Sequence, residues 1–328
     1  MPETDDQYEY IRGWALRRGQ ATTTAAPRLD KSALYTRARG ALLGLAAGEL
    51  IGAARAGRAD GREWGQHTVL AVCTAESLLE TPGFDAKDQM ERFLLWKREG
   101  NRGDHATVPL SDDVNRALAT YRWRGIATAG SHDPRDRSGS SLSRAIAAAL
   151  YGLGDPAAAV MLAAECSRTT HQGPVVLDVC RYYAAMIVGA LRGAGVSVAS
   201  NRYEPVAELW TRRPLKREVE EVAATVPLVE RPSKKPVEPD VLKTLANARR
   251  VLMVSSDFPT IVNEATRTAI DPALDGAIAG ALAGAAFGSA AIPASVIAKV
   301  PHLEILDRLA LQFSSLHQPA SPTAGTAR

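Results

Sequence analysis

The chain has few of the residues that mark several common protein classes. Phe, Trp and Tyr together make up 5% of its 328 residues, and there are three cysteines. Cys73, Cys166 and Cys180 form no Cys-x-x-Cys pair and lie within apolar helical patterns. A disulfide framework and a cysteine-rich metal site are therefore not expected. We expect all three cysteines to be reduced and buried.

The chain also lacks a long run of one charge sign. Its 39 basic and 36 acidic residues are mixed and give a formal charge of +3, so we expect no nucleic-acid partner. The first ten residues are acidic and have no signal-peptide pattern, which favours a cytoplasmic location. Residues 276–298 carry no charge but are rich in Ala and Gly and include Pro293. For that segment we expect a buried helix, a turn and a second helix, and no membrane span.

No segment shows the alternation of apolar and polar residues that is typical of a strand, whereas apolar residues recur at helical spacing along the chain. Gly and Pro separate the helical patterns, with Ser32, Asp85 and Ser111 as predicted N-caps. We therefore predict an all-α protein with one compact multi-helix domain. The expected divisions are an N-terminal arm at 1–30, the domain at 31–314 with an irregular surface excursion at 198–240, and a disordered tail at 315–328.

Two helical segments carry a glycine at every fourth residue. The first is "RGALLGLAAGELIG" (39–52), which also holds a lone acid, Glu49, and the second is "DGAIAGALAGAAFG" (275–288). Residues i and i+4 lie on one face of a helix, and each mid-helix glycine costs about 0.5–1 kcal/mol relative to alanine. Close packing offsets such a cost, so we expect the two stripes to lie in a tight core, facing each other.

The N-terminal arm carries apolar and aromatic residues in "YEYIRGWALRR". Tyr10 and Trp14 would be exposed on a short helix, and exposed aromatic rings favour contact with another surface. A frayed tail and an arm that docks on the body or on a protein partner both fit this pattern.

Three segments resemble the ADP-ribosylglycohydrolase family: "RARGALLGLAAGELIG", "TTHQGP", and "DPALDGAIAGALAGAAFG" followed by "IP". The resemblance covers roughly residues 36–312. It implies an all-α fold around two Mg or Mn ions, which help to cleave the bond between ADP-ribose and its acceptor. Hard divalent cations need oxygen ligands, chiefly carboxylates.

The carboxylates that the resemblance implies are mostly absent. The family's Thr-Asp-Asp-Thr run corresponds to "GQHT" (65–68) in this chain. Only Thr68 matches, and His67 replaces the second acid. An Asp-Thr-Asp-Thr run falls on "DPAL", which keeps Asp271, and Asp275 follows one position later. Asp271 before Pro272 is also a typical helix N-cap. One alternative is a single softer ion such as zinc on His67 and Asp271, with Glu49 or Asp275 as a further ligand, and the other is a His67 that fills the vacated space.

Other positions of the resemblance are partly kept. Glu49 stands where the family has an aspartate, and a buried acid there needs the backbone or an arginine such as Arg144 as its partner. An Asp-Ile-Gly triplet falls near residues 109–111. Candidate ligand-binding residues are Ser140, Ser141, Arg144 and His171, although the serines also suit a helix start and His171 a structural role.

These losses indicate a degenerate family member with a binding or regulatory role and no expected cofactor. An ADP-ribose-like small molecule is the expected ligand, and Glu49 and Asp271 would be remnants of the catalytic centre. Two alternatives remain open. One is an active hydrolase with an altered or metal-independent site, for which Mg or Mn would be the cofactor if the family site works. The other is a structural or partner-binding helical protein.

Overall fold

A computed structural model describes residues 30–58, 63–81, 83–100, 109–200, 207–225, 240–267 and 269–317. The predicted all-α class is confirmed, because these residues form helices and one isolated bridge between Ser131 and His171. The α-helices are α2 (Lys31–Arg55), α3 (Gln66–Glu80), α4 (Ala86–Glu99), α5 (Asp112–Arg124), α6 (Ala145–Tyr151), α7 (Pro156–Arg168), α8 (Pro174–Gly189), α9 (Ser197–Ser200), α10 (Ala207–Arg212), α11 (Arg217–Ala224), α12 (Val241–Val254), α13 (Phe258–Arg267), α14 (Pro272–Phe287), α15 (Ala294–Ile297) and α16 (Leu303–Leu316). Shorter helical turns are η2 (Leu142–Arg144), η3 (Ala190–Ala194) and η4 (Ser289–Ala291).

The two glycine stripes face each other at the centre of the fold. A Cβ built on Gly44 would lie 2.1 Å from the carbonyl oxygen of Gly280, and one on Gly48 would lie 1.9 Å from that of Gly276. The partner number falls as the number along α2 rises, so α2 and α14 run antiparallel. The prediction that the stripes pack against each other is confirmed, and the backbones approach too closely for any side chain at these positions.

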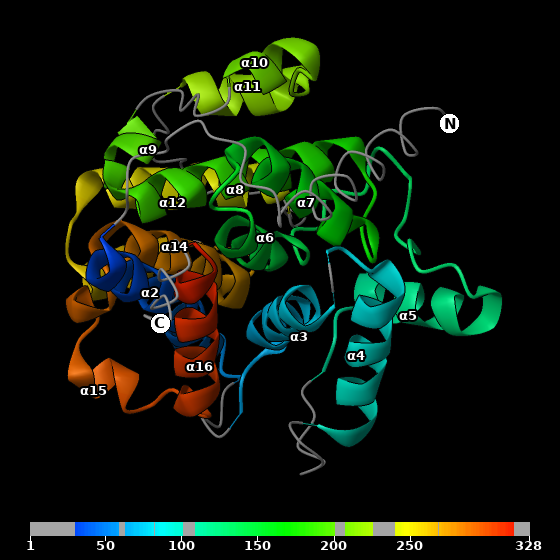
Figure 1. Cartoon of the computed structure of the whole chain (residues 1–328), viewed down its shortest axis with the longest axis horizontal. Helices are drawn as coiled ribbons and strands as arrows, with labels where there is room; N and C mark the ends of the chain where they lie inside the picture. The colour runs from blue at the N-terminus through cyan, green and yellow to red at the C-terminus, as the bar shows by residue number, and fades with distance from the viewer. Residues whose placement is uncertain are drawn as a thin grey trace, which may run out of the picture.

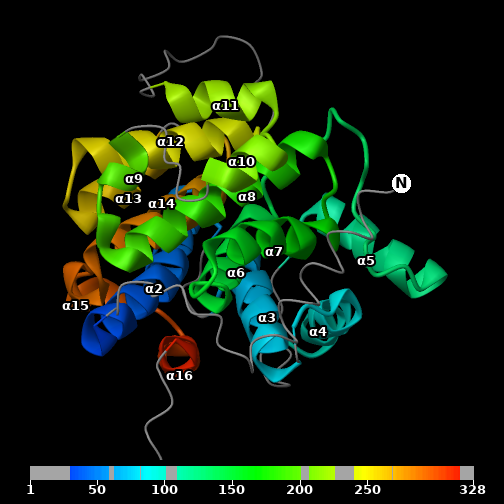
Figure 2. The same ribbon diagram turned by 45° about the horizontal axis from the view of Figure 1, so that its top comes forward.

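The other helices cover this central pair. Helices α12 and α13 pack against α14, and α16 packs against α2. Helices α6, α7 and α8 contact one another, and α3 joins them through α6. In both ribbon views α15 and α5 lie at opposite ends of the molecule (Figures 1 and 2).

The ends of several helices follow the predicted signals, with exceptions. Asp85 caps α4 by accepting from the backbone N–H of Lys87 and Asp88. Asp30, rather than the predicted Ser32, caps α2 by accepting from Ala33 N–H. Ser111 precedes α5, but its hydroxyl bonds Asp113 instead of the helix backbone. Helix α16 continues to Leu316, two residues beyond the expected end of the domain.

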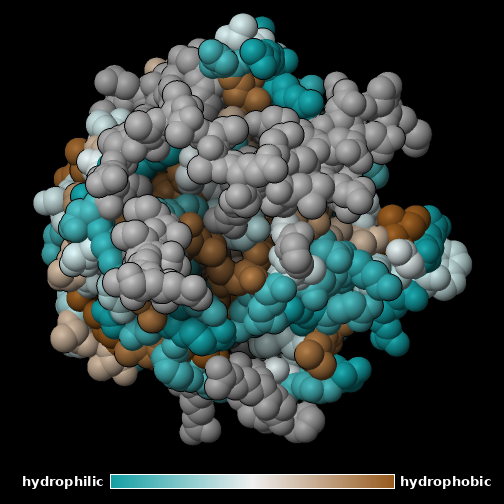
Figure 3. All heavy atoms as spheres, viewed as in Figure 1, coloured by the Kyte–Doolittle hydropathy of each residue, from teal (hydrophilic) through white to brown (hydrophobic). Residues whose placement is uncertain are grey.

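The most apolar segments lie inside the fold. The helical stretch Pro174–Ala194 is long and apolar enough to cross a membrane, but 94% of its most apolar window is buried. Residues 276–298 form α14 after its first four residues, buried as far as Ala285, and then η4 and α15. Hydrophilic residues dominate the lower right of the surface in Figure 3, and one group of hydrophobic residues lies near its centre. The three cysteines are free and buried, as predicted.

Several expectations lie outside the described residues. The arm with Tyr10 and Trp14 is one, and residues 318–328 of the tail are another. Within the expected excursion at 198–240 the structure describes α10 and α11. These divisions of the chain therefore stay predictions.

Candidate functional site

The candidate site lies where the first turns of three helices meet a side chain of α2. Glu49 of α2 bonds the start of α3. Gln66 of α3 accepts from the backbone N–H of Ser111, the residue before α5, at 2.7 Å. His67 of α3 lies opposite Asp271, the N-cap of α14. The N-termini of α3, α5 and α14 thus converge, and the starts of α3 and α14 are the positions that the family resemblance assigns to metal binding.

The carboxylate of Glu49 caps α3. Its Oε1 accepts from His67 N–H at 2.9 Å, and its Oε2 accepts from Thr68 N–H at 2.9 Å and from the Thr68 hydroxyl at 2.6 Å. Of the two partners expected for Glu49, the backbone is correct and Arg144 is not. Unpaired N–H groups and the helix dipole favour an anion at a helix N-terminus. Glu49 is 2% exposed, and both its oxygens are engaged in this cap.

Gly65 gives Glu49 the space to reach α3. A Cβ on Gly65 would lie 2.1 Å from Glu49 Oε1 and 2.4 Å from its carboxyl carbon. The longer acid at 49 and the missing side chain at 65 are therefore complementary.

His67 fills the interior beside the start of α14. It is 1% exposed, and its Nε2 lies 3.9 Å from Asp271 Oδ2. Its Nδ1 is buried and finds no hydrogen-bond partner within the described part of the chain. Asp271 accepts from Leu274 N–H and is followed by Pro272, so the helix-cap interpretation of Asp271 is confirmed.

Asp275 faces a different helix. Its oxygens accept from the Thr244 hydroxyl at 2.6 Å and from the Asn247 amide at 2.9 Å, and both donors lie on α12. Burial raises the pKa of Asp275 to about 6, although the bonds from Thr244 and Asn247 favour its ionised form. Thr244, Asn247 and Asp275 therefore tie α12 to α14.

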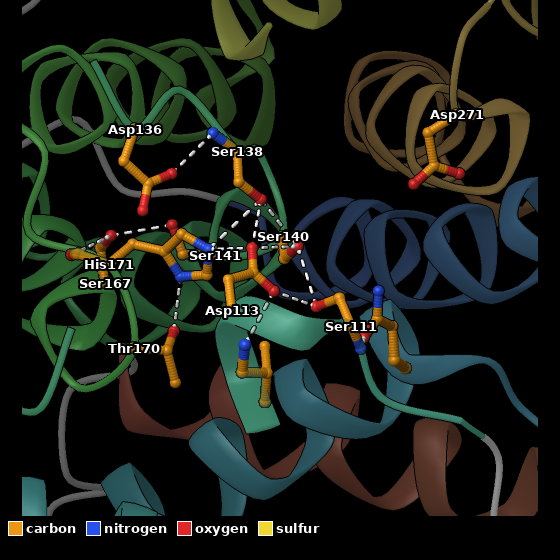
Figure 4. A network of polar contacts seen from close by, with 12 residues as sticks. Ser111, Asp113, Asp136, Ser138, Ser140, Ser141, Ser167, Thr170, His171 and Asp271 are labelled. Atoms are coloured by element: carbon orange, nitrogen blue, oxygen red, sulfur yellow. Dashed lines mark hydrogen bonds and ion pairs between the residues drawn. The ribbon is translucent and has the colours of Figure 1, made fainter. Parts of the chain in front are cut away.

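A second polar cluster surrounds Asp113 in the first turn of α5 (Figure 4). His171 Nε2 lies 2.6 Å from its Oδ2, and the Ser140 hydroxyl donates to the same oxygen at 3.1 Å. Ser111 and Ser138 donate short hydrogen bonds to its two oxygens. The backbone N–H of Val114 adds a further donor at 2.7 Å. Figure 4 shows Asp271 apart from this cluster, with no contact to it among the residues drawn.

These donors stabilise Asp113 as an anion. Burial alone would raise the pKa of its carboxyl, but hydrogen bonds from His171, Ser111 and Ser138 outweigh it and hold this pKa well below its usual range. The Asp113 side chain is 10% exposed, whereas that of His171 is 1% exposed. Such a carboxylate is a strong acceptor and a weak base.

The remaining predicted ligand residues lie deeper. Ser141 accepts from the Ser167 hydroxyl at 2.8 Å and is fully buried. Arg144, at the end of η2, is also fully buried and donates to the carbonyl oxygens of Cys166 and Ser167. Of the four predicted ligand residues, Ser140 and His171 bond Asp113 directly, and the other two lie behind them. The ligand-binding roles themselves stay predictions.

Asp113 and Ser138 are central residues that the sequence reasoning missed. The family's Asp-Ile-Gly triplet falls near residues 109–111, and Asp113 lies two residues beyond that segment. Acids at the first turn of a helix usually serve its dipole, so nothing local marks Asp113 as the centre of a cluster. Its partner His171 is 58 residues away.

A concave pocket lies elsewhere on α3. It has a volume of about 270 Å³ and is bounded by α3, α4 and the start of α16, with Trp64, Trp96 and Ile305 among its lining residues. None of the candidate site residues lines it. In the part of the chain that the structure describes, no group of three or more His, Cys, Asp or Glu side chains is placed to hold a metal ion.

Comparison with known proteins agrees with the arrangement of these helices. The ADP-ribosylarginine hydrolase Tri1 of Pseudomonas putida (strain GB-1) is 26% identical over 176 residues, which cover 48% of this chain and 47% of the relative. This chain therefore matches about half of that relative's length. A solved structure titled "ADP-ribosylglycohydrolase-related protein complex" superposes with a TM-score of 0.73 at 27% identity, over 88% of this chain and all of the other. The profile of the ADP-ribosylglycohydrolase family matches residues 30–323. The chain belongs to the ADP-ribosylglycohydrolase family.

Proposed function

We propose that this chain is a non-hydrolytic member of its family, which binds an ADP-ribose-like ligand in a regulatory or scaffold role in the cytoplasm. The observation that carries the proposal is the commitment of Glu49. This acid stands at a family carboxylate position, and both its oxygens cap α3. A carboxylate engaged in this way has little capacity left to share with a cation.

The other side chains at the family's metal positions support the same conclusion. Gln66 is bonded to Ser111, and His67 is a nitrogen ligand, which hard cations accept poorly. Asp275 is bonded to α12. Of the acids at these positions, Asp271 is the most exposed, with 30% of its side chain accessible. This donor set does not fit two hard cations, whose charges need several carboxylates between them.

An active hydrolase with a metal-independent site is the second candidate. The pair of Asp113 and His171 favours it, since a carboxylate and an imidazole in contact are a common acid–base pair and the Asp113 side chain is 10% exposed. However, the pKa of Asp113 is held well below its usual range, which makes this carboxylate a poor general base at neutral pH. A structural or partner-binding role through the N-terminal arm is the third candidate.

Calorimetry and an activity assay on the full chain separate these candidates. We expect saturable binding of ADP-ribose, unchanged by 5–10 mM Mg or Mn at roughly physiological ionic strength, and no release of ADP-ribose from a mono-ADP-ribosylated arginine protein. Binding that strengthens with either cation, or release of ADP-ribose, would overturn the non-hydrolytic proposal. A folded protein without ADP-ribose binding would also overturn it and would favour the partner-binding role.

A further inference from the structure

Helix α11 is held on the surface of the fold by few apolar side chains. It packs on α8 and α12 and lies on their outer side in both ribbon views (Figures 1 and 2). Val219 and Ala223 are its buried residues. An element with so little buried apolar surface can open without unfolding the rest of a protein. How often α11 opens then depends on the polar contacts at its two ends.

The two helices beneath α11 supply side chains that clamp its ends. At the start of α11, Asp178 of α8 accepts from the backbone N–H of Lys216 at 2.7 Å. At its end, Arg249 of α12 donates to the carbonyl oxygen of Thr225 at 2.9 Å and, by a short bond, to that of Val222. The N–H groups at a helix start and the carbonyls at its end lack helical partners, and the helix dipole favours an acid and a base there, respectively. The charges of the two clamps therefore match the ends of α11.

Arg249 is a buried charge whose partners are backbone carbonyls. It is 1% exposed, and within the described part of the chain no carboxylate pairs with it. It also donates to the carbonyl oxygen of Ala199 in α9 at 3.2 Å. Opening of α11 would return the guanidinium to water, and its hydration would offset part of the bonds lost. The clamp at the end of α11 is therefore reversible.

Helix α11 also contacts the loop that carries donors to Asp113. Arg137 donates to Glu218 of α11 at 2.7 Å, and its carbonyl oxygen accepts from the Val241 N–H at 2.9 Å. The next residue, Ser138, donates its hydroxyl to Asp113 by a short bond. Because Arg137 and Ser138 are adjacent, the contact with α11 is one residue away from the contact with Asp113.

We propose that α11 is a strap that opens independently of the rest of the fold, and that its link from Glu218 to Arg137 steadies the donors of Asp113. While α11 is closed, Arg137 is held at both its guanidinium and its carbonyl group. When α11 opens, the guanidinium keeps only its longer contact with Asp240, at 3.7 Å. Ser138 then leaves Asp113 more readily. The inference rests on the contacts of α11 and does not depend on the proposed function.

Hydrogen exchange of the native full chain at increasing denaturant concentrations tests whether α11 opens separately. We expect the backbone N–H groups of residues 220–225 to exchange through an opening that exposes less surface than global unfolding. Their exchange should therefore depend less steeply on denaturant than that of the buried α14. Exchange of α11 that matches α14 at every denaturant concentration would overturn the proposal without any variant.

Two substitutions test the link to Asp113. The readout is exchange of the backbone N–H groups of Ser138 and Val241, which are hydrogen-bonded on either side of Arg137. Glu218→Gln breaks the link, so these two groups should exchange about twofold to fivefold faster, the range for loss of one exposed ion pair. Arg249→Met releases the end of α11 and should speed exchange in α11 and at both groups. Combined with Glu218→Gln, Arg249→Met should bring no further rise at Ser138 and Val241.

Glu221→Gln is the matched control, because the Glu221 carboxylate bonds the exposed Arg217 of the same helix. It should leave exchange at Ser138 and Val241 unchanged. Wild-type exchange at these two groups in Glu218→Gln would contradict the link to Asp113, and this variant lies at an exposed position that folding tolerates. A folded Arg249→Met variant with wild-type exchange in α11 would contradict the clamp.

Discussion

The carboxylate of Glu49 occupies the space in which a side chain on residue 65 would lie, with Oε1 2.1 Å from the position of a Cβ on Gly65. The acid reaches three donors at the start of α3 through this space. The two positions therefore form one structural unit, in which the long acid needs the glycine.

Gly65→Ala is expected to destabilise the fold by about 1–3 kcal/mol, because the new methyl group displaces Glu49 and leaves buried donors unpaired. Chemical denaturation of the single and double variants measures this cost. Combined with Glu49→Asp, Gly65→Ala should cost less than it does alone, since the shorter acid leaves room for the methyl group. Equal costs in both backgrounds would show that the two residues are not coupled.

Restoring the family's acids should create a cation site. The variant carries Glu49→Asp together with Gly65→Thr, Gln66→Asp, His67→Asp, Pro272→Thr, Ala273→Asp and Leu274→Thr. We expect saturable Mg binding by calorimetry, because several carboxylates then converge at the starts of α3 and α14. Asn in place of each new Asp is the matched control and should not bind Mg. A folded variant that binds no Mg would argue against the placement of these positions.

Asp113→Asn is expected to destabilise the protein by about 2–4 kcal/mol at pH 7, because it removes the anion on which five hydrogen bonds converge. The pKa of Asp113 is held well below its usual range by His171, Ser111 and Ser138 despite burial. Its ionised form therefore adds stability above the unfolded value near 3.8, and this contribution is lost as the pH falls further. Unfolding curves from pH 3 to 7 should show a smaller acid loss in the variant than in the wild type.

Asp275 should change the stability with pH in the opposite direction to Asp113. Burial raises its pKa to about 6 from the ordinary value of 3.8, so the folded state holds a proton that the unfolded state loses between these values. Stability should fall as the pH rises from about 4 to about 6, by at most roughly 3 kcal/mol. Asp275→Asn, measured by denaturation at both pH values, should remove this slope. A slope that persists in the variant would assign it to another group.

Gly44→Ala should lower the free energy of unfolding by more than about 3 kcal/mol or prevent folding. The new Cβ would lie 2.1 Å from the backbone oxygen of Gly280. The hydrogen-bonded backbone of α14 cannot move aside as a side chain can. Thermal unfolding compares Gly44→Ala with Ala54→Gly at an exposed position of the same helix, which should cost about 1 kcal/mol. If Gly44→Ala costs no more than this control, the tight packing of α2 on α14 is not required.

The amino-acid sequence alone was sufficient for the helical class and for the central pair of helices. Glycine at every fourth residue is a local pattern, and a bare ridge on each of two helices has few uses other than close packing. The helix caps at Asp85 and Asp271 could also be predicted from the sequence, because a capping side chain bonds residues two or three positions away.

The site depended on contacts that no local pattern contains. Glu49 and Thr68 are 19 residues apart, and Asp113 and His171 are 58 apart. How α2 lies against α3 decides whether Glu49 contacts a cation, an arginine or a helix N-terminus. The missing side chain at Gly65 matters only once α2 and α3 are in contact. The sequence by itself determined which helices form and which pair packs most tightly, since both follow from neighbours along one helix. Only the tertiary structure decided what each buried acid bonds, because its donors come from helices that folding brings together.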